Sequence, residues 1–118
     1  MSITNWSENT VLVELAGEPQ TREEIHCVIQ EVRKRGDCDV VVDFSAVTIL
    51  TSASLAVLLR LKKLLDDCGR RLSLCCVSPS TQGILSIIGL DDFFEIFDDR
   101  FDVLATLQAV PASEIDRR

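Results

Sequence analysis

Apolar and polar residues alternate along this chain in blocks that predict strands and helices in turn. Residues 10–16, 40–44 and 72–77 are short apolar runs with the length of buried strands, and turn residues bound them. Two weaker strands are expected around residues 2–6 and 93–97. The pattern therefore predicts a sheet whose central strands are buried.

Four segments with helical periodicity lie between and after these strands. They are residues 21–36, 52–69, 78–89 and 101–107. The first opens on Thr21 and Glu24, which have the spacing of a capping box. The third opens on Ser78 and Pro79, which signal a helix start. Its apolar side is expected to consist of Ile84, Leu85, Ile87 and Ile88.

The alternation of strands and helices assigns the chain to the α/β class. Strands joined through helices pair in parallel by right-handed crossovers, and the helices cover the sheet. A chain of 118 residues is long enough for a single domain, which we expect to span residues 1–110. Residues 111–118 are expected to form a flexible tail.

The overall charge limits the kinds of partner. An excess of acidic residues gives a formal net charge of −7, which opposes binding to nucleic acid or to an anionic membrane surface. The N-terminal residues have no basic region followed by an apolar stretch, and no apolar run reaches the roughly 20 residues of a membrane helix. We therefore expect a cytoplasmic protein that does not insert into a membrane.

Residues that carry metal and redox chemistry are sparse. The five cysteines are odd in number and lack a CxxC spacing, and His26 is the single histidine. This pattern fits reduced cytoplasmic thiols and indicates no metal, cofactor or disulfide framework. An enzyme would need a nucleophile with a base or a polar pocket, and the sequence has no motif of that kind. We expect a protein that is not an enzyme.

The most informative position is Ser52, where a buried strand gives way through a polar turn to a long helix. Backbone N–H groups in the first helical turn have no partner within the helix, so a residue there can hold or display negative charge. Serine and threonine are also favoured there simply as caps. Thr51 is the expected cap, and Ser54 is expected to be exposed. Asp43 is expected to bind the turn that follows its strand.

Several short motifs of this chain occur in the same order in a known family. Residues 42–47 resemble that family's strand and following turn, and residues 50–55 (Leu-Thr-Ser-Ala-Ser-Leu) fall at its Asp-Ser-Ser/Thr-Gly-Leu motif. Residues 15–18 (Leu-Ala-Gly-Glu) are similar to its Leu-x-Gly-Glu corner, and residues 88–94 resemble its Gly-Leu-x-x-x-Phe ending. Over nearly its whole length, the chain resembles the STAS domain of anti-sigma factor antagonists.

The resemblance implies a small, mostly parallel sheet with helices packed on one side. It further implies that Ser52 is phosphorylated by a partner that is both an anti-sigma factor and a serine kinase. In this family the unmodified protein binds that kinase, and a serine phosphatase reverses the modification. The implied partner-binding residues are Gly17, Glu18, Thr51, Ser52, Ala53 and Ser54.

The chain departs from the family motif at three positions. Thr51 replaces the aspartate, Ala53 the second Ser/Thr, and Ser54 the glycine. Position 51 therefore lacks the acidic group that would orient the serine and complement the helix N-terminus. A second hypothesis follows: a STAS domain without the phosphoswitch, acting as a scaffold or accessory subunit of a stressosome-type assembly or a membrane-transport complex. The sequence leaves the oligomeric state open.

Overall fold

The computed structural model describes the backbone of residues 2–115 and the side chains of residues 2–107. In chain order, the elements are β1 (Ser2–Ser7), β2 (Thr10–Glu14), α1 (Thr21–Arg35), β3 (Asp39–Asp43), α2 (Ser52–Asp67), β4 (Leu72–Cys75), α3 (Pro79–Ile87), β5 (Glu95–Phe97) and α4 (Arg100–Ile115). The kind and order of the elements match the sequence prediction.

The strands form a single five-stranded sheet in the order β1-β2-β3-β4-β5. β1 pairs with β2 in the antiparallel sense, and the other neighbours pair in parallel. Parallel neighbours need a crossover connection, which α1, α2 and α3 provide. The predicted α/β class and the mostly parallel mixed sheet are confirmed.

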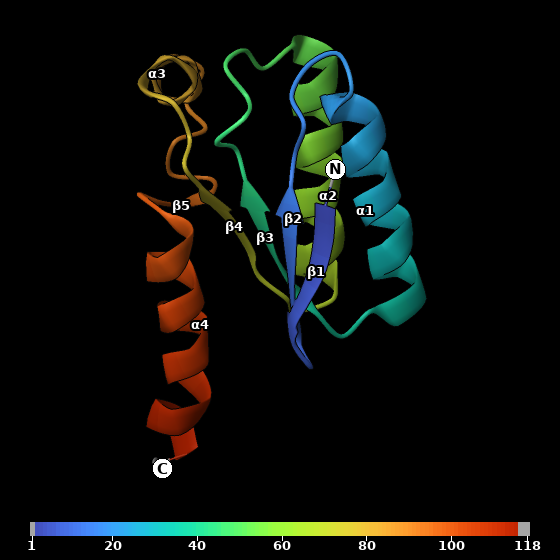
Figure 1. Ribbon diagram of the computed structural model, residues 1–118, viewed down its shortest axis with the longest axis vertical. Coiled ribbons are helices and arrows are strands. Elements are labelled where there is room, and N and C mark those ends of the chain that lie inside the picture. Colours follow the sequence, from blue (N-terminus) through green and yellow to red (C-terminus); the bar gives the residue numbers. More distant parts are fainter. Residues whose placement is uncertain (1, 116–118) are drawn as a thin grey trace.

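Helices cover both faces of the sheet (Figure 1). α1 and α2 pack together over one face, where their apolar residues join those of the strands in the main core. α4 packs on the opposite face in a smaller cluster, formed by Leu12, Val41, Cys75, Val103, Leu104 and Leu107. The expectation of helices on one side only is therefore wrong, because the closing helix has an apolar stripe that the second face of the sheet buries.

α2 supplies the centre of the main core. Leu58, Leu61 and Leu65 are each 0% exposed, as their helical spacing predicts. Burying a leucine side chain contributes about 1.5–3 kcal/mol, so these contacts fix the helix firmly against the sheet. The position of its first residue, Ser52, is fixed with it.

The start of α1 differs from the predicted capping box. Gln20 occupies the cap position, and Thr21 is already the first helical residue. The Glu24 carboxylate accepts a hydrogen bond from the backbone N–H of Ala16 at 2.9 Å. Glu24 therefore ties α1 to the corner after β2.

α3 buries less than its periodicity predicts. Leu85 is 1% exposed, but Ile84 and Ile88 are 46% and 49% exposed and Ile87 is 86% exposed. The predicted apolar side is therefore covered only in part: Leu85 is buried, and the three isoleucines are exposed. α3 lies beyond the ends of the strands (Figure 1), so the sheet covers only part of its surface.

α4 runs Arg100–Ile115, so helical backbone continues past the domain end predicted at residue 110. Residues 116–118 of the predicted tail lie outside the described residues. The flexibility of residues 111–118 stays a prediction. Within the described part of the chain, no helix is both long and apolar enough to cross a membrane.

Candidate functional site

Two loops meet at the start of α2. Residues 15–20 form the corner between β2 and α1, and residues 44–51 connect β3 to α2. Gly17 is buried in this contact, and a Cβ atom on it would lie 2.7 Å from the backbone oxygen of Ala46. Its φ of +102° also favours glycine. Gly17 therefore allows the two loops to approach each other closely, with no side chain between them.

Glu18 extends from this corner to the N-terminus of α2. Its Oε2 atom accepts hydrogen bonds from the backbone N–H of Thr51 (3.2 Å), the Thr51 hydroxyl (3.3 Å) and the Ser54 hydroxyl (2.7 Å). A carboxylate there complements the partial positive charge of the helix end. Glu18 therefore supplies the acidic group that the motif lacks at position 51.

Thr51 is the cap of α2, as the sequence predicts. Its Oγ1 atom accepts a hydrogen bond from the backbone N–H of Ser54 at 3.1 Å. Ser54 itself is 0% exposed, so the expectation of an exposed first-turn residue is wrong. Its hydroxyl is buried against Glu18. A buried side chain offers a partner no surface, so Ser54 positions Glu18 and Thr51.

Ser52 is the first residue of α2 and is exposed, as is Ala53 beside it. Glu18 binds Thr51, which precedes Ser52, and Ser54, which follows it. Ser52 itself is not part of this hydrogen-bonded group. The N–H groups of a first helical turn point out of the helix towards solvent or a ligand. An anionic group on Ser52 would stand at the positive end of the helix dipole.

Replacing Glu18 by alanine is expected to lower the free energy of unfolding by about 1–2 kcal/mol, because the buried Ser54 hydroxyl loses its carboxylate acceptor. Urea unfolding checks this value. Glu23→Ala is the matched control, since Glu23 is an exposed carboxylate in the first turn of α1. Equal losses in the two variants, each below about 0.5 kcal/mol, would show that Glu18 acts only as a surface charge.

A second polar cluster lies on the α4 side of the sheet. Glu14 and Asp43 are in register at the ends of β2 and β3, and Arg100 at the start of α4 binds both carboxylates. The Arg100 Nη2 and Nε atoms lie 2.6 and 3.1 Å from Asp43 Oδ2. Asp43 Oδ1 accepts a hydrogen bond from the backbone N–H of Ser45 at 2.8 Å, so the predicted contact with the following turn is confirmed.

The Asp43 carboxylate is buried and charged. Burial opposes the charged form, but hydrogen bonds from Ser45 and from the Arg100 guanidinium outweigh it and lower the pKa of Asp43. The pKa of Arg100 is raised, first by its hydrogen bond to Glu14 and also by its contact with Asp43. These opposite shifts favour a charged cluster at neutral pH, which holds the start of α4 on the sheet.

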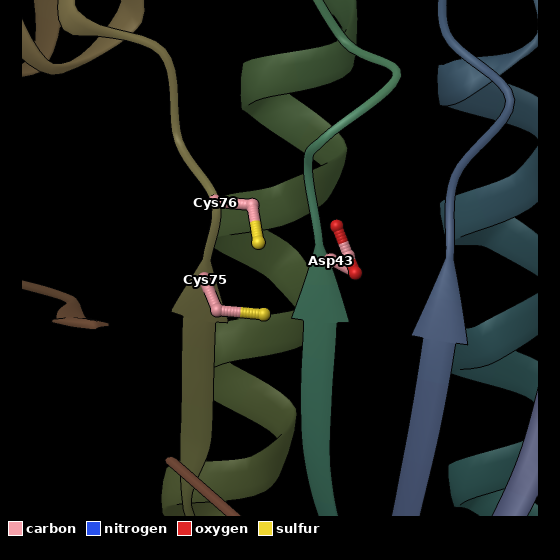
Figure 2. Close-up of side chains that lie close together, drawn as sticks. All are labelled: Asp43, Cys75 and Cys76. Carbon is pink, nitrogen blue, oxygen red and sulfur yellow. The ribbon is translucent and has the colours of Figure 1, made fainter. Parts of the chain in front are cut away.

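Two cysteines lie beside Asp43 (Figure 2). Cys75 is paired with Asp43 across β3 and β4, and Cys76 has a left-handed backbone with φ of 59°. Ligand atoms of the three residues lie within 4.8 Å of one another. Burial raises the pKa of both thiols, however, and each Asp43 oxygen already has a hydrogen-bond partner. The arrangement fits protonated thiols beside an ion pair better than metal ligands.

The role of Arg100 and Glu14 was missed by the sequence reasoning. Arg100 is the single basic residue in the otherwise acidic stretch 91–102. A cation isolated among carboxylates is a signal for pairing, but it does not indicate which carboxylate is the partner. The strand-end acids Glu14 and Asp43 become neighbours only through parallel pairing of β2 and β3.

The fold and the site together define a class of protein. A mostly parallel sheet carries a Gly-Glu corner that meets the start of the following helix, and an exposed serine opens that helix. A family model described as the STAS domain matches residues 7–102. The chain therefore belongs to the STAS-domain family.

Known proteins resemble this chain over most of its length. The anti-sigma F factor antagonist of Paenibacillus polymyxa is 26% identical over 103 residues, covering 85% of this chain and 88% of that protein. An anti-sigma-factor antagonist (STAS) domain protein from Planctomyces limnophilus has a TM-score of 0.79 at 15% identity, over 91% of this chain and 97% of that one. The Bacillus cell fate determinant SpoIIAA, in its phosphorylated form, has a TM-score of 0.68 at 16% identity, over 89% and 97% of the two chains. The two structural similarities concern the fold.

Proposed function

We propose that this protein is an anti-sigma factor antagonist, a cytoplasmic binding protein that captures an anti-sigma factor with serine kinase activity and is released by phosphorylation of Ser52. The observation that carries the proposal is the exposed Ser52 hydroxyl at the start of α2 in a STAS domain. The Paenibacillus relative is named an anti-sigma F factor antagonist, and SpoIIAA has a phosphorylated form. The protein is the substrate of the transfer, and the kinase is the catalyst.

A phosphate on Ser52 would change the surface far more than the fold. It adds about −1.5 to −2 charge at neutral pH. The helix dipole and the free N–H groups of the first turn stabilise an anion there, and the exposed position leaves the phosphate solvated. A partner docked over Ser52 would have to remove that water from a charged group, which is costly. One modification is therefore enough to disrupt an interface and leave the domain folded.

The exposed isoleucines of α3 form the second part of the proposed docking surface. Ile84, Ile87 and Ile88 have the spacing of neighbours on one side of a helix, and all three are exposed. α3 and the start of α2 lie at the same end of the molecule (Figure 1). Exposed apolar patches are typical of protein–protein interfaces. The proposed partner covers Ser52 and buries these isoleucines.

Ile87→Asp is expected to weaken binding to the kinase about tenfold or more, because it places an unpaired charge in the centre of an apolar contact. The free energy of unfolding should change by less than about 1 kcal/mol, since Ile87 is 86% exposed. Titration calorimetry measures the affinity. Phe101→Asp is the matched control, because Phe101 is 72% exposed at the start of α4. Equal affinities of the two variants would remove α3 from the proposed surface.

Phosphate transfer tests the proposed function directly. The protein is mixed with ATP and each candidate anti-sigma kinase of its own organism, and its intact mass is measured. One added phosphate is expected on the wild type and on Ser45→Ala, which changes another exposed serine, and none on Ser52→Ala. Failure of every kinase both to bind and to transfer phosphate would refute the proposal. A stable partner complex that is indifferent to changes at Ser52 would favour the scaffold hypothesis.

A further inference from the structure

The outer groove between α1 and α2 concentrates positive charge in an otherwise acidic protein. The whole chain has a formal net charge of −7. The groove has a volume of about 300 Å³, and its lining includes His26 and four charged residues, Arg33, Arg60, Lys63 and Asp67. Lys63 and Asp67 pair with each other at 3.6 Å, so the two arginines carry the excess positive charge. The local charge is therefore opposite to that of the molecule. This contrast points to an anionic ligand.

The two walls of the groove carry one arginine each. Arg33 lies in the last turn of α1, and Arg60 lies on α2. Within the described residues, neither guanidinium has a hydrogen-bond or ion-pair partner. In contrast, four other arginines each pair with a carboxylate, namely Arg35, Arg70, Arg71 and Arg100. The two groove arginines are thus available for a ligand.

Each wall of the groove also carries an apolar side chain, Ile29 on α1 and Leu64 on α2. Ile29 is 5% exposed and Leu64 is half-buried, and both line the groove. Guanidinium groups bind phosphate through paired, charge-assisted hydrogen bonds. A ligand with a phosphate head and an apolar body would satisfy both parts of the groove.

We propose that this groove binds a small organic phosphate, with its phosphate between Arg33 and Arg60 and its apolar body against Ile29 and Leu64. The volume is at the lower end of the range for small-molecule sites. The α2 lining residues, 60–67, span only about 10 Å of helix, which favours a compact ligand over a long acidic protein segment. These residues lie in the C-terminal half of α2, whereas Ser52 is its first residue. The proposal is therefore independent of the proposed kinase contact.

Nuclear magnetic resonance titration of the full ¹⁵N-labelled chain with phenyl phosphate tests the proposal. Saturable shifts are expected for amides that line the groove. Arg33→Gln and Arg60→Gln should each weaken binding about tenfold, because each removes a charge-assisted contact to the phosphate. Lys34→Gln is the matched control, since Lys34 is exposed, lies next to Arg33 and does not line the groove. It should bind phenyl phosphate like the wild type.

Two further probes test whether the groove recognises both the phosphate and the apolar body of a ligand. Inorganic phosphate should bind about tenfold more weakly than phenyl phosphate, because it has no apolar body to place against Ile29 and Leu64. Hexaglutamate, as an acidic peptide, should also bind more weakly. The proposal is overturned if phenyl phosphate causes no saturable shift, or if Lys34→Gln loses as much affinity as the groove variants. Binding of inorganic phosphate or hexaglutamate at least as tight as that of phenyl phosphate would also overturn it.

Discussion

Replacing Arg100 by methionine is expected to lower the free energy of unfolding by about 3 kcal/mol at neutral pH. The variant keeps an apolar side chain of similar length but loses the guanidinium that binds Asp43 and Glu14. Asp43 is 2% exposed, so its charge would remain buried without a cation. Removing one partner of a buried ion pair costs about 3–5 kcal/mol. The lower value applies because the Arg100 side chain is 31% exposed.

The dependence of this loss on pH identifies Asp43 as the group left unpaired. Its pKa in the folded protein is lowered from the ordinary value of 3.8, so its stabilising contribution is present above that value and is lost as pH falls through the folded pKa. In Arg100→Met the burial remains and the cation is gone, so the folded pKa of Asp43 should rise. The difference in stability between the two proteins should therefore be largest near pH 7 and shrink below about pH 4. Urea unfolding at several pH values measures it.

Arg71→Met is the matched control for this experiment. Arg71 pairs with Glu95 at 2.9 Å, but the Glu95 side chain is 45% exposed. Pairs of this kind contribute about 0–1 kcal/mol. If Arg100→Met lowers the free energy of unfolding no more than Arg71→Met does, the cluster of Glu14, Asp43 and Arg100 does not anchor α4. The double variant Arg100→Met/Asp43→Asn should be more stable than Arg100→Met, because it leaves no buried charge.

The fold was predictable because local periodicity and core burial agree for most elements. The spacing of Leu58, Leu61 and Leu65 predicts the buried face of α2, and the structure confirms it. The same kind of spacing places Ile84, Ile87 and Ile88 on the apolar side of α3, but these residues are exposed. Periodicity identifies an apolar side of a helix, but it contains no information on whether another element covers that side. The exposed face of α3 depends on where the helix lies relative to the sheet.

The site was predictable only in its local part. The strand, turn and serine pattern predicts that Thr51 caps the helix that Ser52 opens, and the structure agrees. The contact of Glu18 with Thr51 spans 33 positions of the sequence, so no local pattern reveals it. Glu24 illustrates the same limit, since its carboxylate binds the backbone of Ala16 and forms no predicted capping box. In both cases a tertiary contact replaces the partner that spacing suggests.

Ser52→Glu is expected to weaken binding to the proposed anti-sigma kinase partner about 100-fold, which corresponds to about 2.7 kcal/mol. A carboxylate that must be desolvated in an interface costs several kcal/mol when nothing opposite pairs with it. The free energy of unfolding should change by less than about 1 kcal/mol, because residue 52 is exposed at the positive end of the helix dipole. Calorimetric titration and urea unfolding measure the two quantities, and Gln30→Glu is the control for added charge, because Gln30 is exposed on α1.

Glu18 also affects the expected stability of Ser52→Glu. Its carboxylate already occupies the N-terminus of α2, so a glutamate at position 52 meets a like charge. Ser52→Glu should therefore be less destabilising in a Glu18→Gln background, by about 0.5–1 kcal/mol. A stability loss above about 2 kcal/mol in Ser52→Glu alone would instead make the hydroxyl a structural group. Unchanged kinase affinity would mean that the surface around Ser52 is not the docking site, because a partner seated there has to desolvate the new carboxylate.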